Sequence, residues 1–321
     1  MAITTYKRDN QLVFRMLFTM FLLATLFIGF LSFLFAMGFS PILILAIAIF
    51  MAGFQYFYSD KMVLKTTGAK IVTPDQEPKL HKLIDELCNT SDLPKPKHIA
   101  IMDTSVPNAF ATGRNPKNAV IAVTKGLLNR LNQKELEAVL AHELSHVKNR
   151  DIMVLTWASI IVIMAGYLMQ MLFWMSLFGG FGGGSRDRNS VGQAMIIMMA
   201  IWIGTIIVYF IAQMLIMTLS RYRELAADRG AAMITGNPMD LASALKKIEQ
   251  EVSNTPEKQV RNVEHASAFF IIPAIKSNFV ASLMSSHPST EKRIQKLKDM
   301  KKMYTASKQE YTKFNIDISK K

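Results

Sequence analysis

The five-residue segment His142-Glu143-Leu144-Ser145-His146, here called the pentad, contains two imidazoles and one carboxylate. It lies in a stretch that has helical patterning. Residues four apart lie on the same face of an α-helix, so both histidines can point at one metal ion. The carboxylate between them then lies near an open coordination position, where a water molecule would bind. This arrangement is typical of zinc hydrolases, although so short a pattern also occurs by chance.

A catalytic zinc ion usually has three protein ligands and one open position, so a third ligand must come from elsewhere in the chain. Glu224 and Asp228 lie four residues apart, just after an apolar run. This apolar run, residues 189–220, and the one before it, residues 152–185, should form a hairpin. The hairpin returns the chain to the helix that carries the two histidines. We therefore expect Glu224 to be the third ligand and Asp228 to orient a ligand histidine through its second nitrogen.

Two alternatives for the third ligand remain open. In the first, Glu224 is only a solvated partner of Arg221 or Arg223, because such pairs are common on helices. A histidine could also take the position, and the chain has four outside the pentad: His81, His98, His265 and His287.

The composition places much of the chain in a membrane. Half of the 321 residues are hydrophobic, and the mean hydropathy is +0.22. Three long runs contain no Asp, Glu, Lys or Arg, and a membrane helix needs about 20 apolar residues. The first run is long enough for two spans with a turn between them. We therefore expect four transmembrane helices, near Met16–Met37, Pro41–Tyr58, Met153–Phe178 and Gln193–Leu219.

These spans divide the chain into four parts. Residues 1–59 would form an N-terminal transmembrane hairpin and residues 152–220 a second hairpin. Residues 60–151 would carry the pentad, and residues 221–321 the third ligand. A cleaved signal peptide over residues 1–38 is disfavoured, because the apolar run exceeds a signal-peptide core and a second span follows at once. Buried core helices are disfavoured by the length of the charge-free runs.

The distribution of lysine and arginine predicts the orientation. Basic residues cluster at one end of each span. The connections at the other end, between the two spans of each hairpin, carry only the basic residues Arg186 and Arg188. The positive-inside rule therefore places both termini and both polar parts in the cytoplasm. Basic residues that face anionic lipid account for the net charge of +13, so we expect a lipid bilayer and no nucleic acid as partner. The single Cys88 excludes an internal disulfide and suits a reducing compartment.

The patterns in the polar parts predict an α+β integral membrane protein, mostly helical with a small β-sheet. Asn132, followed three residues later by Glu135, resembles a capping box that begins the pentad helix, which should end near Asn149. Pro107 makes residues 105–113 either an edge strand or a loop. Other expected elements are helices over Asp75–Cys88, Ser220–Arg229 and Thr290–Met303, strands over His98–Met102 and Ala119–Val123, and a loop or membrane-surface segment over Ala266–Met284.

Taken in order, these segments resemble the HtpX family of bacterial membrane-bound zinc metalloproteases, which is related to the CAAX prenyl endopeptidases. The resemblance extends over essentially the whole chain. It implies a gluzincin-like fold and an active site on the cytoplasmic face of the bacterial inner membrane. It also implies a role in stress response and quality control, with membrane proteins as the main substrates. The matching segments are the N-terminal double apolar hairpin, 142–146, 224–228, 108–113, 286–290 and 293–294.

The resemblance adds two expectations about the site. It places the His287 segment over the site, where this histidine would be a catalytic group that stabilises the oxyanion. Alternatively, His-Pro-Ser-Thr only caps the helix that follows. It also favours an edge strand over a loop for the segment that carries the four residues Asn108, Ala109, Phe110 and Ala111, which would pair with an extended substrate.

We therefore expect a membrane-anchored endopeptidase with one zinc ion per chain. Glu143 would take a proton from the attacking water and later pass one to the leaving amine. A transporter or metal-binding scaffold without protease activity is the alternative, but transporters hold ionisable ligands inside their spans, and these spans contain no charged residue. A protease with its metal inside the bilayer is disfavoured by the polar residues 148–151, which separate the pentad from the next span.

Overall fold

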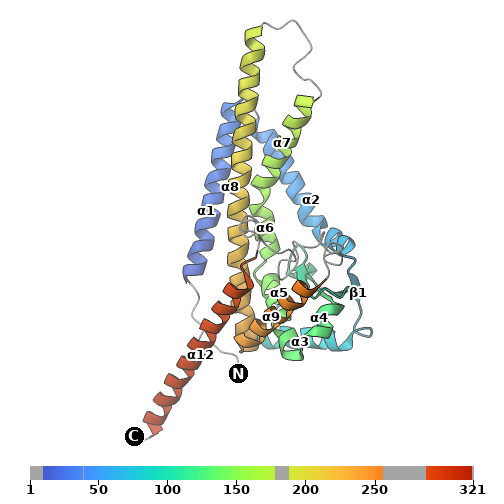
Figure 1. Cartoon of the computed structure of the whole chain (residues 1–321), viewed down its shortest axis with the longest axis vertical. Helices are drawn as coiled ribbons and strands as arrows, with labels where there is room; N and C mark the ends of the chain where they lie inside the picture. The colour runs from blue at the N-terminus through green and yellow to red at the C-terminus, as the bar shows by residue number, and fades with distance from the viewer. Residues whose placement is uncertain (1–9, 39, 178–187, 256–286, 320–321) are drawn as a thin grey trace. The chain divides into compact units, whose positions relative to one another are not determined.

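The computed structural model describes residues 10–38, 40–177, 188–255 and 287–319, and Figure 1 follows the chain by colour from blue to red. The chain divides into two compact units. The first, here called the apolar unit, combines residues 10–58 with 153–220. The second, here called the polar unit, contains residues 59–152 and 221–321. Each unit therefore joins segments that are far apart in the sequence.

Long helices build the apolar unit. Their buried faces pack on one another through large side chains such as Phe30, Leu34 and Leu168. Other large side chains point outward, and Phe50 is 76% exposed. Water would make this exposure costly, whereas hydrocarbon chains would not. The helices are α1 (Asn10–Ala36), α2 (Pro41–Thr67), α6 (Asp151–Ala158), α7 (Ile160–Leu177) and α8 (Arg188–Thr235), of which α2, α6 and α8 also extend into the polar unit.

Among the described residues, three helical stretches are long and apolar enough to cross a membrane: Asn10–Ala36, Asp151–Trp174 and Ile196–Thr235. They overlap the first, third and fourth expected spans. The second expected span corresponds to a helix pair, Ile42–Tyr58 and Lys61–Thr67, which is bent by 61°. The described part of the chain therefore contains three candidate membrane helices, or four if the bent pair forms one span.

A small mixed sheet belongs to the polar unit. Its strand order is β1-β2-β4-β3, with β2 and β4 parallel and the two outer pairs antiparallel. Within residues 105–113, the part after Pro107 forms the edge strand β3, whereas residues 105–108 are irregular. The strand expected at Ala119–Val123 begins one residue later. The strands are β1 (Lys70–Val72), β2 (His98–Met102), β3 (Ala109–Thr112) and β4 (Val120–Thr124).

Helices make up most of the polar unit. The helix expected from Asp75 begins at Pro78, and the one expected to end at Met303 continues to Ser319. The expected loop at Ala266–Met284 lies outside the described residues. The helical elements are α3 (Pro78–Ser91), the short 3₁₀ turn η1 (Pro116–Asn118), α4 (Lys125–Arg130), α5 (Gln133–Lys148), α9 (Pro238–Asn254) and α12 (Thr290–Ser319).

The start of α5 is fixed by local and long-range polar contacts. Asn132 Oδ1 accepts a hydrogen bond from the Glu135 backbone N–H at 3.0 Å, and Glu135 Oε2 accepts one from the Asn132 N–H at 3.0 Å. This is the capping box that the sequence predicts. Glu135 also receives hydrogen bonds from Ser243 and Lys247 on α9, each at 2.7 Å. Burial would raise the pKa of Glu135, but the contacts from Lys247, Ser243 and the backbone hold it below its ordinary value.

Close packing then brings α8 against α5. The core face of α5 contains small and branched residues that are fully buried, including Ala138, Ala141 and Leu144. A Cβ atom added at Gly230 would collide with the Ser145 side chain, so the two helices approach at a point that only glycine allows. Glu224 and Asp228 lie on this same stretch of α8. The approach therefore positions both carboxylates beside the two pentad histidines.

Candidate metal centre

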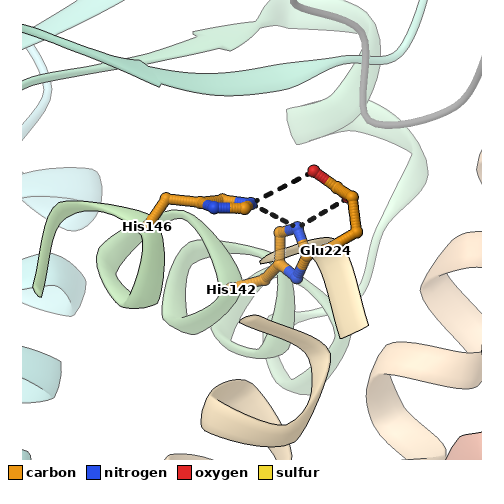
Figure 2. Close-up of side chains that lie close together, drawn as sticks. All are labelled: His142, His146 and Glu224. Carbon is orange, nitrogen blue, oxygen red and sulfur yellow. Dashed lines mark hydrogen bonds and ion pairs between the residues drawn. The ribbon is translucent and has the colours of Figure 1, made fainter. Parts of the chain in front are cut away.

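Three side chains from two helices converge in the polar unit (Figure 2). His142 and His146 extend from α5 and Glu224 from α8, and one ligand atom of each lies within 4.8 Å of the others. The two Nε2 atoms are 3.1 Å apart. Glu224 Oε2 lies 3.6 Å from Nε2 of His142, and its Oε1 lies 3.4 Å from Nε2 of His146. The structure thus brings together the three residues that the sequence proposes as ligands.

These separations match what a tetrahedral metal ion requires. With zinc–ligand bonds of about 2.0–2.1 Å, neighbouring ligand atoms in a tetrahedron lie about 3.3 Å apart. The two Nε2 atoms are 3.1 Å apart, and each lies 3.4–3.6 Å from a different oxygen of Glu224, so the distances are close to this value. Two imidazoles and one carboxylate are also a ligand set that catalytic zinc sites use. The geometry and the chemistry of the donors therefore fit a zinc ion with one open position.

His142 contacts a second carboxylate on its other side. Its Nδ1 lies 3.0 Å from Asp228 Oδ1. Arg293, from the start of α12, donates to both Asp228 oxygens, at 2.9 and 2.6 Å, and is fully buried. A proton on Nδ1 would face Asp228, and the Nε2 lone pair would then be available to a metal ion. Asp228 therefore lies where the sequence predicts a residue that orients a ligand histidine.

His146 has an equivalent contact, with a residue that the sequence analysis did not identify. Its Nδ1 lies 2.6 Å from Asp151 Oδ2. Asp151 in turn pairs with Arg223, which is the residue before Glu224 on α8. Both Asp151 and Arg223 are buried. The alternative that Glu224 is a solvated partner of Arg223 does not describe this site, because Glu224 is itself buried and Arg223 pairs with Asp151.

The buried charges around the three ligands favour a divalent cation. Among the described residues, four carboxylates and two guanidinium groups are buried in this region, so with neutral imidazoles these six groups carry two excess negative charges. Burial of uncompensated charge is costly, and a divalent ion would neutralise it. The buried charged residues are Glu143, Asp151, Arg223, Glu224, Asp228 and Arg293.

The two ligand imidazoles have altered proton affinity. Burial alone would lower the pKa of His142, but hydrogen bonds to Asp228 and Glu224 raise it above its ordinary value. Burial likewise opposes protonation of His146, whereas Asp151 and Glu224 raise its pKa well above the ordinary value. A metal ion competes with protons for these nitrogens, so metal affinity should fall as the pH is lowered.

Glu143 lies on α5 between the two histidines and is 4% exposed. Burial of Arg293 would lower the pKa of its guanidinium, but nearby carboxylates, first Asp228 and also Glu143, raise it. Glu143 is therefore a buried carboxylate within electrostatic range of the site. In the H-E-x-x-H pattern, this sequence position between the two histidines belongs to the candidate general base.

The His287 segment also reaches the site. His287 Nδ1 lies 3.1 Å from Glu224 Oε2. The same segment begins α12, where the Lys292 N–H donates to Ser289 Oγ at 3.4 Å. The two interpretations of this segment are therefore compatible, because it caps a helix and also places a histidine beside the third ligand.

The candidate substrate-binding residues Asn108, Ala109, Phe110 and Ala111 lie along the edge of the sheet. β3 pairs with β4 on one side, and in the described part of the chain no strand pairs with its other side. The strand also packs against α5. Asn108 is fully buried, and its backbone N–H and C=O bond to Thr124. β3 is therefore the last strand in the sheet order and lies against the helix that carries the pentad.

Three buried residues of the site escaped the sequence analysis as site residues: Asp151, Arg223 and Arg293. Arg293 had appeared only as part of a matching segment. Asp151 follows the pentad by five residues, a separation that would place it on another face of a continuous helix. The expected end of the helix near Asn149 was the only sequence signal at this point, and it did not predict that the chain turns so that Asp151 faces His146.

Comparison with known proteins gives consistent results. The model of peptidase family M48 matches residues 74–301. Protease HtpX homolog 2 of Methanosarcina mazei is 53% identical over 92% of this chain and 97% of its own length. The HtpX homolog of Moorella thermoacetica is 49% identical over 89% of this chain and 93% of its own length. Protease HtpX homolog 1 of Streptomyces coelicolor is 41% identical over 91% of this chain and 93% of its own length.

One solved structure has a similar fold. The crystal structure of S. mikatae Ste24p aligns with a TM-score of 0.51 over 85% of this chain at 19% sequence identity. This chain spans 62% of that protein. At this level of identity the likeness concerns the fold alone.

Proposed function

Because the chain belongs to peptidase family M48 and is a membrane metalloprotease, we propose that it is a zinc endopeptidase whose ion is held by His142, His146 and Glu224. One observation supports this assignment above all. One ligand atom of each of these three residues lies within 4.8 Å of the others, and a carboxylate, Glu143, sits between two of the ligands in the sequence. One zinc ion per chain fits this set.

The proposed chemistry assigns each residue a separate task. Zinc, when bound, supplies a Lewis acid that acidifies a water molecule and polarises a peptide carbonyl. Glu143 accepts a proton from the attacking water and passes one to the leaving amine nitrogen, a contribution of about 10²–10⁴-fold in rate. Asp228 holds the Nδ1 proton of His142, so that Nε2 remains a donor to the metal.

Two further residues or segments complete the proposed site. His287 would donate a hydrogen bond to the oxyanion that forms from the substrate carbonyl. Its 3.1 Å approach to Glu224 supports a place at the site. The edge of β3 would pair with the main chain of an extended substrate, which gives recognition with little dependence on sequence. Such main-chain recognition suits a protease that degrades misfolded proteins.

We propose the cytoplasmic membrane as the location, with the active site and both termini in the cytoplasm. The basic residues that flank the apolar runs support this orientation. Misfolded membrane proteins would be the main substrates and cytoplasmic proteins a second class, which makes quality control the proposed cellular role. A metal-binding scaffold or transporter does not explain membership of a peptidase family or a buried Glu143 between two ligands.

Membrane vesicles of both orientations test the zinc dependence and the face together. Inside-out vesicles that contain the full chain should cleave added casein, whereas right-side-out vesicles should cleave it only after detergent opens them. A chelator should abolish cleavage, and Zn²⁺ but not Mg²⁺ should restore it, because nitrogen ligands suit zinc. Cleavage by intact right-side-out vesicles alone would invert the orientation, and activity that resists the chelator would contradict the zinc assignment.

A further inference from the structure

The chain breaks its helix immediately after the pentad. α5 ends at Lys148 and α6 begins at Asp151. Arg150, between them, has φ 55°, a left-handed conformation that residues with a Cβ atom rarely adopt. In a continuous helix, residues five apart would point in directions about 140° apart. The left-handed residue redirects the chain, and Asp151 then reaches the His146 imidazole at 2.6 Å.

Arg223 holds Asp151 in this position. Its guanidinium pairs with Asp151 Oδ1, whereas the His146 contact uses Oδ2. The same guanidinium donates to the Asn149 carbonyl at 2.8 Å, so it contacts both sides of the left-handed residue. Arg223 is 7% exposed, and Asp151 is 4% exposed. The next residue along α8 is Glu224, so one arginine connects the α5–α6 junction to the helix that carries the third ligand.

The two ligand histidines therefore have a similar arrangement of carboxylates around them. Each directs Nε2 toward Glu224 and Nδ1 toward a buried aspartate, at 3.0 Å for His142 and 2.6 Å for His146. Each aspartate is paired with a buried arginine, Arg293 or Arg223. Carboxylates on the second nitrogen of a ligand imidazole fix its tautomer and ring orientation. The contacts of Asp151 with His146 and Arg223 stabilise the left-handed backbone conformation at Arg150.

We propose that Asp151, held by Arg223, is a positioning residue for the metal ligand His146. This inference rests on the proposed ligand set. The Asp151 carboxylate keeps the proton of His146 on Nδ1 and the lone pair of Nε2 directed at the metal. Arg223 fixes the Asp151 carboxylate and links the end of α5 to the Glu224 segment of α8. The side chain of Arg223 therefore helps to set the positions of both His146 and Glu224. Asp151 would not touch the substrate.

The test measures zinc affinity and the visible spectrum of the Co²⁺-substituted protein, with the full chain in detergent. Asp151→Ala should weaken zinc binding by about 10–100-fold and change the cobalt spectrum, because a misoriented imidazole alters the ligand field. Asp151→Asn should recover part of the affinity, since its side-chain oxygen still accepts from Nδ1–H. Arg223→Gln should weaken binding by a smaller factor than Asp151→Ala.

Glu135→Gln is the matched control. It removes a buried carboxylate from the other end of α5 together with its 2.7 Å ion pair to Lys247. This variant should lower thermal stability but keep wild-type zinc affinity and the wild-type cobalt spectrum. Equal loss of affinity in Glu135→Gln and Asp151→Ala would overturn the proposal, because the effect would then be general destabilisation.

Three outcomes separate this inference from the proposed function. Wild-type affinity and an unchanged cobalt spectrum in Asp151→Ala would overturn the positioning role while the zinc site stands. Failure of the wild-type chain to bind zinc would remove the ligand set itself, and the inference with it. If Asp151→Ala does not fold, Asp151→Asn and Arg223→Gln decide the question, and wild-type binding in both would contradict it.

Discussion

Glu143→Gln is expected to retain its zinc and to lose most of its proteolytic activity, by about 10²–10⁴-fold, which is the contribution of a positioned general acid–base. Glu143 is not one of the three residues whose ligand atoms converge, so its removal leaves the metal site intact. The amide cannot take the proton of the attacking water at neutral pH. Metal content and casein cleavage, measured on the same preparation, check both halves of the prediction.

Glu137→Gln is the control for this variant. Glu137 lies on the same helix, is only half-buried, and accepts a hydrogen bond from Gln133 at 3.1 Å. Its replacement should leave both zinc content and cleavage unchanged. If Glu143→Gln cleaves at the wild-type rate, Glu143 is not the base. If it loses its zinc, its effect on activity cannot be assigned to proton transfer.

Glu224→Ala should lower zinc affinity and activity together. Structural zinc sites with four protein ligands have an apparent binding free energy of about 10–16 kcal/mol, which is about 3 kcal/mol for each ligand. Loss of one ligand should therefore lower zinc affinity by about 10²–10³-fold. Asp228→Ala should keep the three ligands and weaken affinity or activity by about 10–100-fold. The double variant should be no worse than Glu224→Ala alone, because residues that act as one unit are not additive.

Chelator competition on purified protein measures these affinities. Glu251→Ala serves as the control, since it removes a partly exposed carboxylate that pairs with Arg130 at 3.1 Å elsewhere in the polar unit. It should bind zinc as the wild type does. Full zinc occupancy and full activity in Glu224→Ala would exclude Glu224 as a ligand, and His287, 3.1 Å from its carboxylate, would be the next candidate to examine.

The parts of this structure that the sequence predicted depend on local patterns. The capping box at Asn132 begins α5 where expected, because both of its hydrogen bonds form between residues three apart. The approach of Glu224 to the pentad also followed from connectivity, since two apolar runs in succession return the chain to its starting side. A helix of 48 residues, α8, then carries both carboxylates to the site.

The parts that escaped prediction depend on tertiary contacts or on a single backbone conformation. Arg293 reaches Asp228 across 65 residues of sequence, and no local pattern indicates that separation. The position of Asp151 depends on the left-handed conformation of Arg150, which arginine rarely adopts. Residues 105–113 stayed ambiguous because Pro107 is compatible with either a loop or an edge strand, and only pairing with β4 decides between them.

X-ray absorption at the zinc edge, recorded on the full-length Glu143→Gln protein, tests the central claim most directly. This variant should hold one zinc ion per chain and cannot digest itself. The spectrum should show two imidazole nitrogens at about 2.0–2.1 Å and carboxylate or water oxygen at about 2.0–2.2 Å, with no sulfur. A spectrum with only one imidazole, or with a sulfur from Cys88, would contradict the assignment of His142, His146 and Glu224 as the metal ligands.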